Sequence, residues 1–272
     1  MPQCGCFHNY DLIRIGSKDY KLTVHMEGQA NLKDLLEKAD LAQIVSVDRA
    51  LFGNAFTLTA VREETALRDF LDLLSSRIII DLAPLVEECY ALAPWTVYDE
   101  WEQRARTRVG DLIYRAKYAK DEEAWLNLCA ELEAFIARHP RLRSARAIVA
   151  APKADASTPD LAGRWAEDIA VNRGWRLVRA DKVRPTGPQK EMVEEETEED
   201  VAARVANSVE VENLRRGADV LIVDDTVRSG GTMKEIARAL RVAGAAKVFG
   251  ISVAKDAKFT LGGIDLSREQ WQ

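Results

Sequence analysis

An almost uninterrupted apolar run, DVLIVDD at residues 219–225, constrains the fold of this chain more than any other feature. A strand with one face in water alternates apolar and polar residues, whereas a continuous apolar run is typical of a parallel strand covered on both faces. The run lies among strand-like and helix-like segments that alternate from residue 145 to residue 254. This alternation predicts a parallel sheet with right-handed helical crossovers.

The helices of this part are predicted from their periodicity and end signals. Apolar residues at helical spacing from Trp125 to Ile136 predict a helix that ends at His139-Pro140, because proline lacks an N–H donor and clashes with the preceding turn. Thr158-Pro159 predicts the start of the next helix, and Gly244 predicts the end of the last one. The strands expected between them are 145–151, 175–180, 219–225 and 247–254.

The first hundred residues are predicted to form a smaller mixed α/β region. Asn31, with Asp34 three residues later, predicts a helix start, and residues 63–74 have helical periodicity. Strands are expected at 10–16, 20–26, 41–47, 55–61 and 77–82. A boundary near 95–105 then separates an N-terminal region (residues 1–100), to which no role is assigned, from an α/β domain (residues 101–272).

Composition excludes several classes of protein. The 272 residues are 47% hydrophobic and 30% charged, which argues against a disordered chain and against a membrane protein. No stretch approaches the roughly 20 apolar residues of a membrane helix, and no secretory leader is recognised. The cysteines at 4, 6, 89 and 129 offer no convincing disulfide framework, so we expect a reduced, cytoplasmic setting. Cys129 is expected to be buried on its helix.

Two acids and a small-residue loop follow the apolar run, at the end of the strand where ligands bind in open α/β sheets. Asp224 and Asp225 precede Ser-Gly-Gly-Thr at 229–232, which offers hydroxyls, unobstructed N–H groups and a helix N-terminus. Carboxylates beside such a phosphate cradle suit a ligand with both hydroxyls and a phosphate, such as a ribose 5-phosphate. A Walker loop matches less well, because no G-x-x-x-x-G-K-[ST] occurs.

The segment VLIVDDTVRSGGT at 220–232 resembles the phosphoribosyl-pyrophosphate (PRPP) motif of type I phosphoribosyltransferases. The resemblance implies Mg²⁺-dependent transfer of phosphoribosyl to a nucleobase or amine acceptor, on a parallel sheet flanked by helices. Asp224 and Asp225 would be the catalytic pair, contacting the ribose hydroxyls directly or through Mg²⁺. Thr226 and Ser229, Gly230, Gly231 and Thr232 would hold the 5-phosphate, with Val227 and Arg228 in the same substrate-binding loop. Arg228 either meets a phosphate or is solvated.

Further matches resemble the competence-protein-F (ComF-like) branch of that family. They are DLIYRAKY at 111–118, the strand that ends in Pro152-Lys153, RPTGPQ at 184–189, and Arg204 with Asn207. By this resemblance Pro152 and Lys153 would form the pyrophosphate loop. Arg184 and Gln189 would lie in a hood loop over the site.

Two features depart from the family pattern. Many ComF-like proteins carry a CxxC pair that indicates zinc, whereas this chain has Cys4-Gly-Cys6 near His8 and no second clear pair, which leaves zinc binding open. Arg228 stands where purine-salvage members have an acid, which argues against a hypoxanthine or guanine enzyme of that type.

Three classes of function stay open. The chain is an active transferase, a non-catalytic sensor of PRPP or a nucleoside monophosphate, or an accessory protein in DNA uptake, DNA processing or defence whose residues 1–100 bind a protein partner. The lack of a basic tract interleaved with aromatics weakens direct nucleic-acid binding. A homodimer is the commonest homo-oligomer and stays open as well.

The net charge of −6 comes from one segment. Residues 191–200 hold seven acids and no base and contribute −7, so the rest of the chain is nearly neutral. This acidic segment is either a solvated face or a surface that repels a polyanion or meets a basic partner.

Overall fold

The computed structural model describes residues 4–28, 31–50, 53–75, 77–98, 104–153, 159–183 and 206–256. Several predictions made above lie outside these residues. They concern the residue Thr158, the residues Arg184 and Gln189 expected in a hood loop, Arg204, and the acidic segment 191–200.

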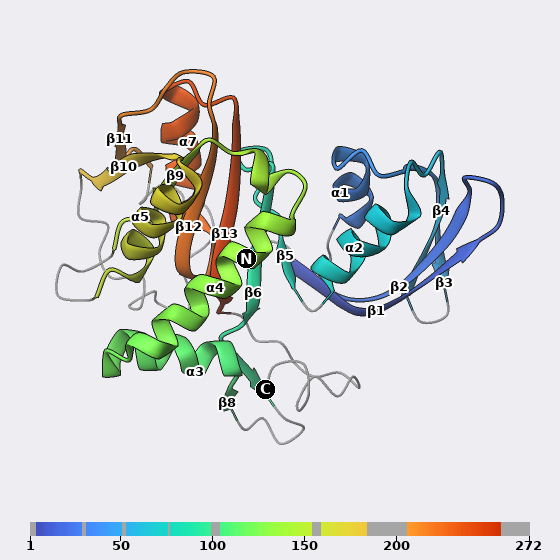
Figure 1. The fold of residues 1–272 in the computed structure, drawn as a ribbon, viewed down its shortest axis with the longest axis horizontal. Coiled ribbons are helices and arrows are strands. Elements are labelled where there is room, and N and C mark those ends of the chain that lie inside the picture. The colour runs from blue at the N-terminus through green and yellow to red at the C-terminus, as the bar shows by residue number, and fades with distance from the viewer. Residues whose placement is uncertain are drawn as a thin grey trace.

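The parallel strands are β6 (Glu88–Pro94), β9 (Ala147–Ala150), β10 (Arg176–Lys182), β12 (Asp219–Val227) and β13 (Lys247–Lys255), and β11 (Val209–Glu212) pairs antiparallel with β10. Those of the N-terminal part are β1 (Cys4–Arg14), β2 (Tyr20–Gly28), β3 (Gln43–Ala50), β4 (Gly53–Thr59) and β5 (Ile78–Ile80). Within the described residues they form one 11-stranded sheet, in the order β11-β10-β9-β12-β13-β6-β5-β1-β2-β4-β3 (Figure 1). The strands from β10 to β6 are parallel, and all other pairs in this sheet are antiparallel.

The helices are α1 (Leu32–Lys38), α2 (Glu64–Leu74), α3 (Arg108–Tyr114), α4 (Glu122–Arg138), α5 (Leu161–Arg173) and α7 (Gly231–Val242). Shorter elements are the π-helix η1 (Arg115–Ala119), the 3-10 helix η2 (Leu142–Ser144), and a two-stranded ribbon of β7 (Thr96–Tyr98) and β8 (Arg104–Arg106). No helix in the described part of the chain is long and apolar enough to cross a membrane.

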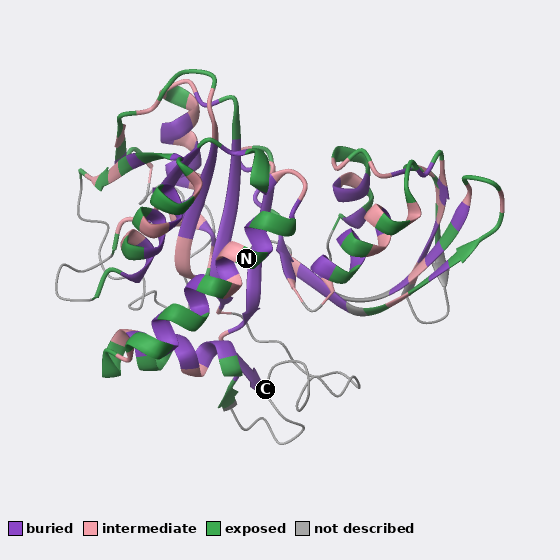
Figure 2. Ribbon diagram, viewed as in Figure 1, coloured by how far each residue is buried: buried purple, intermediate pink, exposed green. Residues whose placement is uncertain are grey.

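Strand β12 is covered on both faces, as its apolar run predicts. Leu221 and Val223 pack in a buried cluster with α4 and α5, whereas Val220 and Ile222 pack in a second cluster with α7. Successive side chains of a strand point to opposite faces, so each face of the sheet is closed by helices. Figure 2 shows the buried strands between these layers. The fold is therefore α/β, with a helix-flanked parallel sheet and a smaller N-terminal region.

Several local predictions are confirmed. The Asn31 side chain accepts the Asp34 N–H at 3.2 Å and caps α1. Helix α4 ends at Arg138 with His139 as its cap, and Gly244 adopts φ 98° just after α7. Cys129 is buried.

The predicted start of α5 is wrong. The cap is Asp160, whose carboxylate accepts the Gly163 N–H at 2.8 Å, and the helix begins at Leu161. Asp160 directly precedes the buried Leu161, so the helix begins where its apolar face first meets the sheet. An aspartate at that position serves as the N-cap, so the helix starts after Thr158-Pro159.

Strand β6 is absent from the sequence prediction, although all seven of its residues are buried. Pro94 does not prevent this strand from forming, because it is the last residue of the strand. Tyr90 of β6 lies opposite Ile251 of β13. The parallel sheet thus includes residues from the first hundred, and the boundary near 95–105 stays a prediction.

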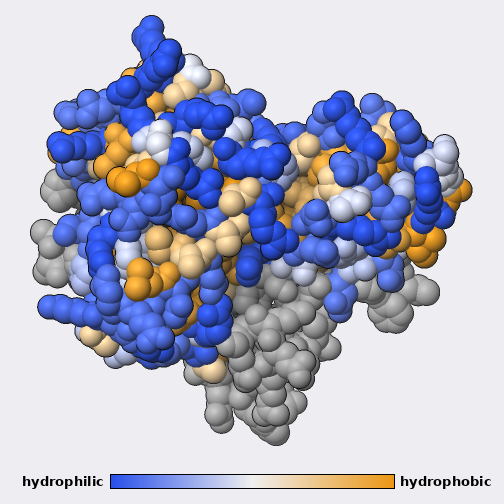
Figure 3. Space-filling model, in the orientation of Figure 1, coloured by the Kyte–Doolittle hydropathy of each residue, from blue (hydrophilic) through white to orange (hydrophobic). Residues whose placement is uncertain are grey.

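The N-terminal region extends the sheet sideways (Figure 1). Cys4 of β1 pairs with Ile80 of β5, so the antiparallel strands join the parallel ones through hydrogen bonds. Polar side chains cover most of the face seen in Figure 3, while Ile13 on β1 and Val45 and Val47 on β3 are exposed. No cluster of three or more His, Cys, Asp or Glu side chains able to hold a metal occurs among the described residues, and zinc binding at Cys4 and Cys6 stays open.

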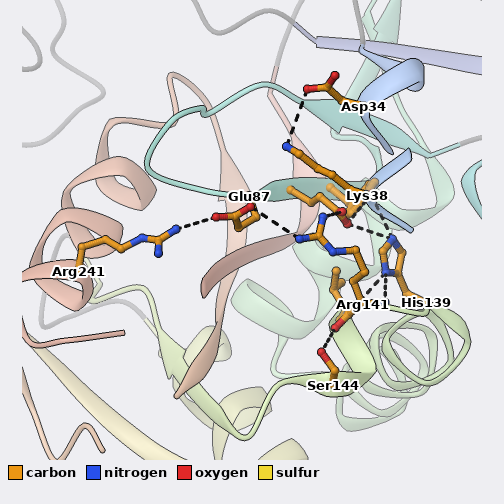
Figure 4. A network of polar contacts seen from close by, with 10 residues as sticks. Asp34, Lys38, Glu87, His139, Arg141, Ser144 and Arg241 are labelled. Carbon is orange, nitrogen blue, oxygen red and sulfur yellow. Dashed lines mark hydrogen bonds and ion pairs between the residues drawn. The ribbon is translucent and has the colours of Figure 1, made fainter. Parts of the chain in front are cut away.

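A buried polar network lies at the amino end of β6 (Figure 4). The Glu88 carboxylate pairs with the Arg141 guanidinium and accepts the Tyr90 O–H at 3.1 Å. His139 Nε2 lies 3.1 Å from the Tyr90 hydroxyl, and its Nδ1 accepts the backbone N–H groups of Arg141 and Leu142 at 3.3 and 3.2 Å. Because Nδ1 is an acceptor, the neutral ring carries its proton on Nε2. Burial lowers the pKa of His139 to about 3, and the positive charge of Arg141 is the second, smaller cause of this shift.

This histidine predicts a loss of stability on acidification. Its pKa is lower in the folded than in the unfolded chain, so below pH 6.5 the unfolded state binds more protons and stability falls. Between pH 7.5 and pH 5, we expect the free energy of unfolding to fall by about 2 kcal/mol more in the wild type than in His139→Asn. The asparagine oxygen keeps an acceptor for the two backbone N–H groups. Urea titrations at several pH values measure the difference.

The comparison of wild type with His139→Asn also controls for Glu88. Burial raises the pKa of Glu88, so its protonation on acidification stabilises the folded state and opposes the effect of His139. The carboxyl group is present in both proteins, so the difference between them reports the imidazole. Parallel pH curves for wild type and His139→Asn would contradict the prediction.

Candidate active site

The two predicted acids lie near the carboxyl end of β12, but inside the strand. The predicted strand ended at Asp225, whereas Thr226 and Val227 continue the ladder opposite Ala254 and Lys255 of β13. The loop that follows is therefore short, from Arg228 to Gly230, and leads directly into α7.

Asp224 and Asp225 lie next to each other in unlike environments. Burial, and to a smaller extent the charge of the neighbouring Asp225 carboxylate, raises the pKa of Asp224 to about 7. Its Oδ1 accepts the backbone N–H of Asp225 at 2.8 Å. The Asp225 carboxylate pairs through Oδ2 with the ammonium of Lys117. At neutral pH a proton therefore competes with a cation for the Asp224 carboxylate, and a bound cation would keep that carboxylate ionised.

The loop from Ser229 to Thr232 forms the N-terminus of α7. Gly230 adopts φ 74° and is the N-cap, while the Ser229 hydroxyl accepts the Gly231 N–H at 3.4 Å. The first N–H groups of a helix have no partner within the helix, and the helix dipole favours an anion there. The hydroxyls and amides of this loop are thus gathered beside the two acids.

Gly230 is required both for its backbone angle and for space. A Cβ there would lie 2.5 Å from Leu82 Cδ2, and the residue that carries it would need a left-handed backbone. We expect Gly230→Ala to lower the free energy of unfolding by about 2–3 kcal/mol, from the left-handed backbone and from overpacking. Gly174→Ala is the matched control, because Gly174 has φ 63° with nothing within 4 Å of its Cβ position. Equal losses in urea denaturation would show that the contact with Leu82 adds nothing.

Lys255, which no sequence pattern indicated as a site residue, holds the base of this loop. Its ammonium donates to the backbone oxygens of Arg228 at 2.8 Å and Asp256 at 3.0 Å, and the residue is only 1% exposed. Burial lowers its pKa. A lysine at the end of an apolar strand usually reaches into water, so its burial here depends on the loop that packs over it.

Two further lysines lie at the same edge of the sheet. Pro152 and Lys153 follow β9, and the Ala151 N–H donates to Val223 O at 2.8 Å, which places them beside the end of β12. Lys182 is the last residue of β10; burial lowers its pKa, and the charge of Asp224 counteracts the shift. Sequence reasoning missed Lys182 and Lys117, although Lys117 lies in a segment that it singled out.

The remaining predicted residues have different outcomes. Arg184 and Gln189 lie outside the described residues. Asn207 is exposed with φ 55°, and the next N–H, of Ser208, donates to the Glu235 carboxylate of α7 at 3.0 Å. This bond attaches Ser208 to α7, the helix that begins after the two acids.

The donor set fits a hard cation such as Mg²⁺. Two adjacent carboxylates supply oxygen ligands, and Mg²⁺ is commonly held by one or two carboxylates together with water and substrate phosphates. With no third acidic or imidazole ligand near them in the described ranges, the remaining ligands would come from the substrate and water.

The family model for the phosphoribosyl transferase domain matches residues 121–258, half of the chain. The chain belongs to the phosphoribosyl transferase domain family. The matched residues include both acids, the loop before α7 and Pro152-Lys153. It begins at Asp121, so Lys117 lies outside it.

Solved structures of adenine phosphoribosyltransferases are similar in fold. One shares 15% identity over 50% of this chain and 72% of its own, with a TM-score of 0.36. That from Thermoanaerobacter pseudethanolicus shares 16% over 59% and 94%, with a TM-score of 0.34. That from Leishmania tarentolae shares 11% over 65% and 94%, with a TM-score of 0.37. No curated protein matches this chain.

Proposed function

We propose that this chain is a Mg²⁺-dependent phosphoribosyltransferase that binds PRPP and transfers its phosphoribosyl group to a nucleobase or amine acceptor. One observation carries the proposal. Two carboxylates on β12 and the N-terminus of α7 meet at one edge of the sheet, within the residues that match the family. That edge offers groups for ribose hydroxyls and for a phosphate side by side.

The roles follow from this placement and from the resemblance. Asp224 and Asp225 hold the ribose hydroxyls and Mg²⁺, and the loop from Thr226 to Thr232 holds the 5-phosphate. Pro152-Lys153 faces the pyrophosphate, and Arg184 and Gln189 belong to the hood. We further propose a ComF-like type of phosphoribosyltransferase in a cytoplasmic setting, which its four free cysteines support.

The reaction replaces one bond at the anomeric carbon of PRPP. The bond to the pyrophosphate oxygen breaks, a bond to the acceptor nitrogen forms, and the acceptor loses a proton. Asp224 and Asp225 would hold Mg²⁺, which would neutralise charge on the leaving pyrophosphate. The protein orients the ribose, excludes water, and keeps the Asp225 carboxylate near the positive charge that develops on the sugar.

The test incubates the protein with Mg²⁺ and PRPP against a panel of nucleobases and amines, and follows pyrophosphate release. Turnover supports a transferase, whereas calorimetric binding without turnover assigns the chain to the PRPP- or nucleotide-sensing class. The proposal fails if neither PRPP nor any nucleoside monophosphate binds. Copurification with the full chain and with a full-chain variant that carries aspartate at the exposed Val45 and Val47 of β3 tests the predicted protein partner, and solution mass tests the homodimer.

A further inference from the structure

Lys117 reaches the site from a segment outside the family match. The Thr107 hydroxyl accepts the Gly110 N–H at 3.0 Å and caps α3, and it donates to Pro94 O, at the end of β6, at 2.7 Å. Helix α3 therefore starts at the carboxyl edge of the sheet, and the chain continues from it into η1, which carries Lys117.

The backbone around Lys117 is fixed on both sides. The Arg115 guanidinium donates to Asp121 Oδ2 from Nε at 2.9 Å and from Nη2 at 2.6 Å. The other oxygen of Asp121 accepts the Ala124 N–H at 3.1 Å and so caps α4. Between these points Ala116 is buried. Single π-helical turns are frequent at functional sites, and this one aims a lysine at the acids.

The ion pair between Lys117 and Asp225 is mostly buried. The two side chains are 19% and 20% exposed, so neither charge is fully solvated. An ammonium has three N–H donors on a flexible stem, and one contact to a carboxylate leaves donors for a second acceptor. PRPP carries its pyrophosphate on C1 of the ribose, next to the C2 hydroxyl. A cation at the carboxylates that bind the ribose hydroxyls is therefore close to the pyrophosphate as well.

We propose that Lys117 is a specificity-determining binding residue, which holds Asp225 in the free protein and directs its ammonium to the pyrophosphate of bound PRPP. The inference rests on the proposed function. It assigns the segment before α4 a part in distinguishing PRPP from ribose phosphates that lack a pyrophosphate.

The test is calorimetric titration of the full chain at one fixed Mg²⁺ concentration, with PRPP and with ribose 5-phosphate. We expect Lys117→Met to weaken PRPP binding about 10- to 100-fold, because a partly desolvated charge pair is lost, and to change ribose 5-phosphate binding less than about threefold. Lys117→Arg keeps the charge and should restore most of the PRPP affinity. The matched control is Lys120→Met, at the exposed end of the same turn.

Equal losses for both ligands, with a lowered Tm, would show that Lys117 only supports the fold, and the inference would be wrong. Unchanged PRPP affinity in Lys117→Met would overturn it too, while leaving the proposed function intact. If the wild type binds neither ligand, the proposed function fails and the inference fails with it.

Discussion

Replacing Asp225 with asparagine is expected to reduce pyrophosphate release from PRPP by about 100-fold or more. Asparagine keeps the shape of the side chain but removes the negative charge that we place beside the ribose and the metal. The change also leaves the ammonium of Lys117 without its carboxylate partner. Initial rates with a saturating acceptor, measured with pyrophosphate detection, give the effect.

Asp219→Asn is the matched control for this prediction. Asp219 begins the same strand, and its distance along β12 places it at the opposite edge of the sheet. Its backbone oxygen, which the substitution keeps, accepts the Arg146 N–H at 3.0 Å. We expect wild-type turnover from this variant. If Asp225→Asn retained wild-type turnover, the assignment of the second acid would be wrong.

Replacing Arg141 with methionine is expected to lower the free energy of unfolding by about 3 kcal/mol or more. The Glu88 carboxylate is fully buried and pairs with this guanidinium, so the variant leaves a buried charge without its principal counter-ion. The loss should be larger at pH 8 than at pH 6, because burial raises the pKa of Glu88 and a proton can then replace the lost cation. Urea denaturation at both pH values measures it.

Arg143→Met is the matched control, since Arg143 is exposed and lies in the short helix η2, of which Arg141 is the N-cap. We expect a change within about 0.5 kcal/mol for that variant. The double variant Glu88→Gln/Arg141→Met should recover part of the loss, because no buried charge remains. A loss in Arg141→Met no larger than in Arg143→Met would contradict the assignment of Arg141 as the counter-ion of Glu88.

The same network connects distant parts of the chain. Arg141 lies 3.7 Å from Glu87 Oε2, and Arg241 of α7 pairs with Glu87 at 2.9 Å (Figure 4). These groups lie at the amino end of β6, at the opposite edge of the sheet from the two acids. Stability and ligand binding are therefore expected to respond to different substitutions.

Local patterns in the sequence predicted many of the elements, and they placed the two acids beside the small-residue loop. The apolar run before Asp224 predicts a strand buried on both faces, and Asn31, Pro140 and Gly244 predict helix ends, because each acts through its own backbone or its nearest neighbours. The acids and the phosphate loop are adjacent in sequence, so their proximity needs no tertiary structure.

Only the tertiary structure decided which cations join those acids. Lys117 and Asp225 are 108 residues apart, and their pairing depends on where α3 starts relative to β6, a strand that the sequence did not reveal. Lys255 resembles any lysine at the end of a strand until the loop of Arg228 covers it. Charges that meet across a sheet edge leave no periodic signal, because contact there depends on strand order, and strand order is fixed by packing of the whole sheet.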